Sequence, residues 1–232
     1  MELLRSWTQQ GLYGMPVAFI DFETTGLVIG EARAVSLAIV HMNLGINNRE
    51  LVYNQVFNPE IPIPKVASDI HGITDEEAQK HPTFIQELPK IMTFLQGRML
   101  AAYNLPFDWG ILDSEMFRTV GLRVPWFGIC GKVVAMQCDD QKQGRGYHKL
   151  VSVAKRRGIT FNAHDAAADA QTAAQILDMM LPQLSKKLTL KFKSFRDFWA
   201  WQRVYAISRE NELRHYFESK GKNRIDWPWT DL

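Results

Sequence analysis

The stretch Val17-Ala-Phe-Ile-Asp-Phe-Glu-Thr-Thr-Gly-Leu27 begins as an apolar run and ends in carboxylates followed by a polar turn. A short apolar run of this kind predicts a central buried strand. In an extended chain, Asp21 and Glu23 lie two residues apart and point to the same face of the sheet. Adjacent carboxylates raise each other's pKa and are costly to bury unless a cation lies between them. Because Mg²⁺ and Mn²⁺ take carboxylate oxygens, the stretch favours a divalent-metal site, and a solvent-exposed acidic strand end is the alternative.

The residues after this strand predict a mixed sheet with helices on its faces. Two strand-like runs, 32–41 and 51–57, flank a turn-rich segment and predict a hairpin. A further short strand is expected at 99–103. Thr74, a capping residue followed by acidic residues, predicts the start of a helix. Helical spacing of apolar residues predicts helices over 84–95, 107–120, 149–157 and 166–181, with Gly121 ending the second and Pro182 the last. This order is typical of an α/β layered domain.

Two further acids and a histidine stand where strands and helices would deliver them to one site. Asp108 follows the strand at 99–103 and opens a helix, so a helix cap or first-turn acid is the alternative. Asp169 lies in an alanine-rich helix that can approach the sheet closely; otherwise it is an exposed helical acid. His164 precedes it by five residues on a loop, and a solvated loop histidine is the alternative. Asp165 is expected to cap the helix and not to bind metal.

Composition bounds the kind of protein. The chain has 232 residues, 46% of them apolar and 22% charged, which excludes a disordered chain. Its two cysteines, Cys130 and Cys138, exclude a disulfide scaffold and a multi-cysteine zinc site, and indicate reduced core residues. No apolar run approaches the length of a membrane span, and the first residues lack a secretory signal pattern. We therefore expect a cytoplasmic protein with no membrane partner.

The sequence divides into three parts: an N-terminal extension at 1–13 with a short helix, a main domain at 14–184 and a C-terminal extension at 185–232. The C-terminal extension holds 11 basic and 6 acidic residues, for a charge of +5, which leaves −3 on the rest of the chain. A basic, aromatic-rich extension beside an acidic, metal-binding body suits a polyanionic partner. A solvated surface without a partner is the alternative.

Within the C-terminal extension, alternating residues predict a strand or extended segment with a basic stripe of Lys187, Lys191 and Lys193, which would contact phosphates. Aromatic residues from Phe195 to Tyr205 then predict an aromatic-rich amphipathic helix. Three interpretations stay open for the extension: additional core, a nucleic-acid clamp, or a docking site for a protein partner.

The segments Asp21-Phe-Glu-Thr-Thr-Gly26, Asn104-x-x-Phe107-Asp108 and His164-x-x-x-x-Asp169, in this order, resemble the motifs of the DEDDh 3′→5′ exonuclease family. That family includes proofreading subunits of bacterial replicative polymerases, ribonuclease T, oligoribonuclease and TREX-type exonucleases. The fragment Ile70-His-Gly-Ile-Thr-Asp75 also resembles the segment that these proteins carry between their first two motifs. The resemblance covers residues 17–182 and leaves the C-terminal extension unmatched.

The resemblance implies a ribonuclease-H-like fold, in which a mixed five-stranded sheet is flanked by helices. It implies that two divalent cations, Mg²⁺ or Mn²⁺, are held by four acids: Asp21, Glu23, Asp108 and Asp169. Glu23 and His164 would be catalytic, with His164 as the general base. Seven residues would contact the substrate: Thr24, Thr25, Leu27, His71, Ile73, Asn104 and Phe107. Tyr103 departs from the family, where many members have histidine before the asparagine of the second motif.

From this resemblance we expect a metal-dependent 3′→5′ exonuclease that releases 5′-mononucleotides from single-stranded or frayed DNA. Its partner is then a nucleic acid with a free 3′ end. DNA is only weakly favoured over RNA, because no residue shows how a 2′-hydroxyl is treated. Two alternatives stay open: an exoribonuclease, and a non-catalytic module that binds nucleic-acid ends or docks a partner.

Overall fold

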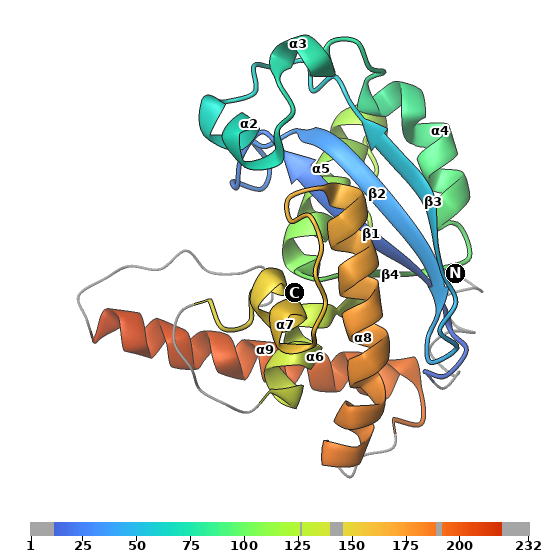
Figure 1. The fold of residues 1–232 in the computed structure, drawn as a ribbon, viewed down its shortest axis with the longest axis vertical. Coiled ribbons are helices and arrows are strands. Elements are labelled where there is room, and N and C mark those ends of the chain that lie inside the picture. The colour runs from blue at the N-terminus through green and yellow to red at the C-terminus, as the bar shows by residue number, and fades with distance from the viewer. Residues whose placement is uncertain (1–11, 126, 140–145, 189–191, 220–232) are drawn as a thin grey trace.

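The computed structural model describes residues 12–125, 127–139, 146–188 and 192–219. These residues form a five-stranded mixed sheet with helices on both faces, which confirms the expected α/β architecture (Figure 1). Most of the expected N-terminal extension lies outside the described residues. Within the described ranges, no helix has the length and apolarity that crossing a bilayer requires.

The sheet is built around β1 (Pro16–Thr24), the strand predicted from the first motif. β2 (Ala34–Asn43) and β3 (Arg49–Val56) follow as an antiparallel meander on one side. The short strands β4 (Met99–Ala102) and β5 (Ile129–Cys130) run parallel to β1 on the other side. The strand order is therefore β3-β2-β1-β4-β5, which places the first motif at the centre of the sheet.

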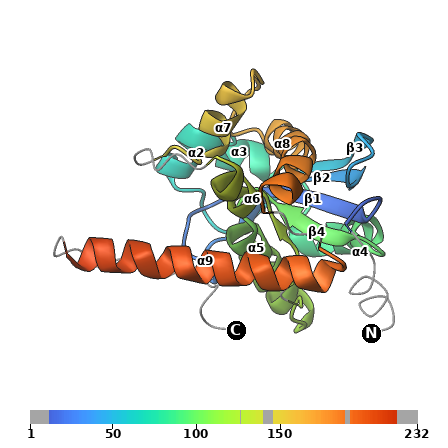
Figure 2. The ribbon, with the colours of Figure 1, turned by 90° about the horizontal axis from the view of Figure 1, so that it is seen from below.

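Helices cover both faces of this sheet (Figure 1). α4 (Phe84–Leu95) and α5 (Leu105–Val120) lie on one face, and α8 (Ala166–Leu188) crosses the other. α9 (Phe195–Glu218) crosses one end of the body, and its C-terminal part extends beyond the neighbouring helices (Figure 2). The shorter helices are α2 (Lys65–His71), α3 (Asp75–Ala78), α6 (Gly131–Cys138) and α7 (Leu150–Arg156). Of these, α2 and α6 were not expected from the sequence pattern.

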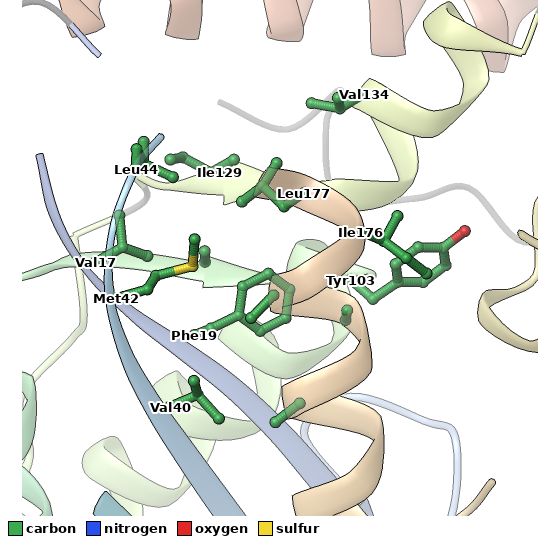
Figure 3. Close-up of a cluster of buried hydrophobic side chains, with 14 of the residues drawn as sticks. Val17, Phe19, Val40, Met42, Leu44, Tyr103, Ile129, Val134, Ile176 and Leu177 are labelled. Atoms are coloured by element: carbon green, nitrogen blue, oxygen red, sulfur yellow. The ribbon is translucent and has the colours of Figure 1, made fainter. Parts of the chain in front are cut away.

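The side chains of β1 alternate between two cores. Val17 and Phe19 pack beneath α8 among its buried alanines and against residues such as Leu177 (Figure 3). The intervening residues, including Ile20, belong to the core that α4 and α5 cover. Because residues two apart share a face of a strand, this alternation directs Asp21 and the acid after it toward α8.

α8 is longer than expected. It continues through Pro182 to Leu188, so the prediction that Pro182 ends the helix is wrong. Proline removes one backbone hydrogen bond from a helix. Here Met180 and Leu184, on either side of the proline, are fully buried on the core face, and this packing keeps the last turns helical.

The basic stripe of the C-terminal extension is also only partly as expected. Lys187 and Leu188 are the last residues of α8, so the predicted strand is wrong at its start. Lys191 lies outside the described residues, and Lys193 is exposed in the connection to α9.

The first half of α9 is part of the core. Phe195 and Phe198 are fully buried beside α8. Gln202 is also fully buried, where its side-chain Oε1 accepts a hydrogen bond from Cys130 N (2.8 Å) and its Nε2 donates to Gly128 O (3.1 Å). α9 therefore covers the edge strand β5, and this part of the extension is the additional core that one of the three interpretations describes.

Candidate active site

The acids of the first motif stand at the end of β1. Asp21 pairs with Ala38 and Glu23 with Ser36 of β2, and the register shifts directly after Glu23. Both residues are half-buried on the face of the sheet that α8 covers. Two carboxylates are unfavourable in such a place unless a cation neutralises them.

Asp108 reaches the same place from α5. It lies in the first turn of that helix and is only 4% exposed. Its Oδ1 accepts a 3.1 Å hydrogen bond from the backbone N–H of Phe22, the residue between the two acids of β1. Asp108 is therefore an acid of the first helical turn, which was the alternative to a site residue in the sequence analysis. It is also hydrogen-bonded to the end of the central strand.

Asp169 and His164 come from α8 and the loop before it. The Oδ2 of Asp169 accepts a hydrogen bond from His164 N (3.2 Å), while its Oδ1 is buried without a hydrogen-bond partner. His164 itself is exposed and has a φ of +68°, a left-handed conformation that few residue types adopt readily. Asp165 caps α8 as expected, because its Oδ1 accepts from Ala168 N at 2.9 Å.

These segments converge on one site. Glu23, His164 and Asp169 each offer a ligand atom, and the three atoms lie within 4.8 Å of one another. Burial raises the pKa of Asp21 well above its usual range, and the charges of Asp108, Asp169 and Glu23 raise it further. Residues separated by more than 140 positions in the chain therefore share one electrostatic environment.

The other acids of the site have raised pKa values as well. Burial, followed by the charge of Asp169, raises the pKa of Glu23 to about 7. Burial raises the pKa of Asp108, although the hydrogen bond from Phe22 N–H opposes the change. Burial raises the pKa of Asp169 to about 6, against the hydrogen bond from His164 N–H. The acids thus resist full ionisation at neutral pH unless a positive charge is present.

A divalent cation fits these residues. The partnerless Oδ1 of Asp169 is an unused ligand atom beside Glu23. Hard cations prefer carboxylate oxygens, and a dication would remove the repulsion that raises the pKa values. The residues that could hold such a cation are the four acids: Asp21, Glu23, Asp108 and Asp169.

The two threonines of the first motif face inward. Thr24 and Thr25 are 8% and 6% exposed. The Thr24 hydroxyl donates to Gly26 O (2.6 Å), and the Thr25 hydroxyl accepts from Arg33 N (3.0 Å). Both side chains thus hold the turn after β1 together, whereas Leu27 beyond them is 84% exposed.

His71 is the last residue of α2, and Ile73 follows it by two residues. Ile73 N–H donates to His71 Nδ1 (3.1 Å), and the Ile73 side chain packs against the small core around Val35. Burial lowers the pKa of His71, and the nearby His164 lowers it further. The expected catalytic histidine therefore influences His71 electrostatically.

The second motif is divided between the site and the core. Asn104 is the half-buried residue before α5, and Phe107 packs at the edge of the core that α5 covers. Tyr103, which departs from the family pattern, points the other way. Its buried ring joins the core beneath α8, and its hydroxyl donates to His148 O at 2.7 Å (Figure 3).

Lys187, the first lysine of the expected basic stripe, lies far along α8 from this site. Lys187 stands 18 residues after Asp169 on the same helix, which corresponds to about 27 Å along its axis. The sequence pattern missed another charged group nearer the acids, formed by Glu115 of α5 and Arg33. The only sequence signal for it is the seven-residue spacing between Asp108 and Glu115, which puts both on one face of a helix.

A family model covers the part of the chain that contains this site. The family model RNase_T, described as "Exonuclease", matches residues 18–177, a range that holds all four acids and His164. The chain is 29% identical over 164 residues to DNA polymerase III subunit epsilon of Pasteurella multocida (strain Pm70), covering 68% of this chain and 64% of the relative. It is 29% identical over 179 residues to DNA polymerase III subunit epsilon of Treponema pallidum (strain Nichols), covering 74% and 80%. This chain thus spans just under two thirds of the Pasteurella relative.

Solved structures show the same fold. A structure of exonuclease I has a TM-score of 0.60 and 19% identity, covering 75% of this chain and 43% of that one. The nuclease domain of 3′hExo, described as a DEDDh family member bound to rAMP, has a TM-score of 0.58 and 19% identity, covering 75% and 94%. These likenesses confirm the ribonuclease-H-like fold. Because the family model spans more than half of the chain, this protein belongs to the exonuclease family, and its motifs are those of the DEDDh type.

Proposed function

We propose that this protein is a metal-dependent 3′→5′ exonuclease that releases 5′-mononucleotides from single-stranded or frayed DNA. One observation carries the proposal: acids from three elements meet at the end of β1, where Asp108 of α5 is bonded to Phe22 N–H between Asp21 and Glu23, and ligand atoms of Glu23, His164 and Asp169 lie within 4.8 Å of one another. Such a cluster is tenable when dications fill it. Relatives named as polymerase III epsilon subunits support the substrate class.

The four acids would together coordinate two divalent ions, Mg²⁺ or Mn²⁺. Asp21 would contact both ions, Glu23 and Asp169 would hold one, and Asp108 the other. When bound, such ions neutralise phosphate charge, lower the pKa of an attacking water and stabilise a leaving oxygen. The hydrogen bond from Phe22 N–H holds Asp108 in position for this role.

His164 would move the proton. Its ring atom lies within 4.8 Å of carboxylate atoms of Glu23 and Asp169, and its side chain is exposed, where a water and a phosphate can reach it. Imidazole is the side chain best suited to accept a proton near neutral pH. The positive φ of His164 and its backbone hydrogen bond to Asp169 fix the loop that presents the ring.

The substrate end would meet the rim of the site. Leu27 is exposed, and Ile73 is half-buried two residues after His71. Apolar contacts with bases accept any sequence, which suits an enzyme that removes nucleotides successively. Asn104 and Phe107 would contact the strand beside Asp108. Thr24 and Thr25 would act mainly through their backbone, since their side chains hold the turn.

The test is cleavage of a 5′-labelled oligonucleotide with Mg²⁺, with Mn²⁺ and with EDTA, on matched DNA and RNA sequences. We expect a ladder of products shortened from the 3′ end, with DNA cleaved faster, and no cleavage in EDTA. Asp21→Asn should abolish cleavage, whereas Asp69→Asn, an exposed acid paired with Lys65 on α2, should not change it. If RNA were cleaved faster than DNA, the proposed substrate would be wrong and the exoribonuclease alternative would be favoured. Binding of 3′ ends without any cleavage would favour the non-catalytic module.

A further inference from the structure

The connection between β1 and β2 is held by α5 beside the acids. We propose that Glu115 and Arg118 are positioning residues that fix this connection for its contact with the substrate end. The proposal rests on the exonuclease function proposed above. The connection, residues 26–33, is called the β1–β2 loop here, and it begins three residues after Glu23.

The β1–β2 loop is closed at its neck. Thr25 N–H donates to Arg33 O (3.0 Å), and Arg33 N–H donates back to the Thr25 hydroxyl (3.0 Å). Near the tip, Ala32 N–H donates to Val28 O at 2.9 Å. These bonds make the loop a compact unit that can be held from outside at a few points.

Glu115 holds the returning end of the loop. Its side chain is 1% exposed, and its Oε1 accepts hydrogen bonds from Arg33 Nε (2.9 Å) and from Ala34 N (3.0 Å). Buried ion pairs add little stability compared with apolar packing, so their best-supported use is to select one arrangement. Here the arrangement selected is the position of the loop on α5.

Arg118 holds the loop nearer its tip. Its Nη1 donates to Ala32 O at 3.2 Å, and its Nη2 donates to Gly30 O. The same Nη1 lies 3.4 Å from Glu115 Oε1, which orients the guanidinium. The planar fork of arginine matches two carbonyl groups in a way that lysine cannot.

The residues that bind the β1–β2 loop stand on the same helix as Asp108, one of the proposed metal ligands. Glu115 and Arg118 follow Asp108 by seven and ten residues, so all three lie along one face of α5. The loop also packs at Gly110, where a β-carbon would lie only 2.7 Å from Ile29 Cδ1. α5 thus positions both a metal acid and the loop that begins after Glu23.

The consequence concerns the tip of the loop. Leu27 and Val28 are 84% and 56% exposed, although the backbone around them is fixed. A rigid apolar tip loses less conformational entropy when it packs against a terminal base than a mobile one does. Glu115 and Arg118 should therefore strengthen substrate binding and leave the chemical step unchanged.

The test compares Arg118→Ala with Arg123→Ala. Arg123 stands just after α5, pairs with Asp113 at 2.7 Å and has no hydrogen bond or ion pair to the loop among the described contacts. We expect Arg118→Ala to raise KM on a single-stranded oligonucleotide about fivefold or more, with kcat within about twofold. Arg118→Lys should not restore KM, and Arg123→Ala should leave both constants unchanged. A loss confined to kcat would overturn the proposal.

A double-mutant cycle identifies the route of the effect. If Arg118 acts through the loop tip, then Arg118→Ala should change KM less than about twofold in a Leu27→Ala background. Additive effects of the two substitutions would show that Arg118 acts elsewhere, and would also overturn the proposal.

A readout independent of turnover separates this proposal from the proposed function. Amide hydrogen exchange of residues 26–32 should be faster in Arg118→Ala than in the wild type and in Arg123→Ala. Dissociation constants for a fluorescent oligonucleotide, measured with Ca²⁺, should follow the same order as KM. Wild-type protein that does not cleave would end the proposed function, whereas unchanged exchange and unchanged affinity in Arg118→Ala would end the positioning role.

Discussion

The backbone N–H of Phe22 donates a 3.1 Å hydrogen bond to Asp108 Oδ1, across 86 residues of sequence. This bond joins the central strand to the first turn of α5 between the two acids of β1. It also favours the ionised form of a carboxylate whose burial favours the neutral form. The acid is therefore fixed in position before any cation binds.

The electrostatics of the site predict how stability depends on pH. Burial and Asp169 raise the pKa of Glu23 from its ordinary 4.5 to about 7. The folded state therefore holds this proton more tightly than the unfolded state, and the metal-free protein loses stability as pH rises from about 4.5 to 7. Glu23→Gln cannot ionise, so in EDTA we expect its Tm to exceed that of the wild type at pH 8 and not at pH 4.

The same substitution should respond differently to metal. Excess Mg²⁺ at pH 8 should raise the Tm of the wild type more than that of Glu23→Gln, because binding to the folded state alone is stabilising. Glu76→Gln, an exposed acid of α3, serves as the control and should follow the wild type. Equal responses of Glu23→Gln and wild type to Mg²⁺ would contradict the role of Glu23 as a ligand.

His164 should be needed for the reaction and not for metal binding. Since φ at this position is +68°, His164→Asn is the better variant, because asparagine adopts this conformation readily and is not a base at neutral pH. We expect kcat to fall about 100-fold or more, with the Tm shift caused by Mn²⁺ retained.

The matched control for this histidine is His81→Asn. The Nε2 of His81 lies 3.1 Å from Glu77 Oε1, just after α3, so replacing His81 should leave kcat within about twofold. Near wild-type turnover of His164→Asn would remove His164 as the general base.

Replacing Gln202 should show how much α9 of the C-terminal extension contributes to the free energy of unfolding. Gln202→Leu leaves the buried Cys130 N–H and the Gly128 carbonyl without partners, and each unsatisfied group costs about 1–3 kcal/mol. Urea unfolding should show that the free energy of unfolding falls by the sum of these two costs. Gln183→Leu, on the exposed side of α8, should change stability by less than about 0.5 kcal/mol. Unchanged stability of Gln202→Leu would mean that these two hydrogen bonds do not hold α9 against β5.

The lysines of the extension should not affect short substrates. Because Lys187 lies about 27 Å along α8 from Asp169, the triple variant Lys187→Ala, Lys191→Ala and Lys193→Ala should cleave an oligonucleotide of about five nucleotides with unchanged KM. With a substrate of about 30 nucleotides, we expect the dependence of affinity on salt to stay the same as well. A shallower salt dependence in the variant would support a nucleic-acid clamp.

Local elements could be predicted from sequence because their causes are local. Thr74 caps α3 through a hydrogen bond from Glu77 N, and Gly121 ends α5 in a left-handed conformation, as its position after the helix indicates. The acids of the first motif share a face because side chains alternate along any strand. Each of these features depends on residues only a few positions away.

Other features depended on neighbours that the sequence pattern does not reveal. Pro182 stays within α8 because Leu184, beyond it, is buried in the core. The two-residue strand β5 is too short to produce a pattern, and it exists through pairing with β4. Tyr103 departs from the family motif without disturbing the acids, because its ring turns into the core.

By itself, the sequence determined which residues are the candidates for the chemistry, since the order and type of Asp21, Glu23, Asp108, His164 and Asp169 are visible in the chain. Only the tertiary structure decided that these groups meet, and that Glu115 holds Arg33 from 82 residues away. The physical reason is that backbone preference and periodicity act over a few residues. Burial, electrostatic repulsion and long-range hydrogen bonds exist only after distant segments have packed together.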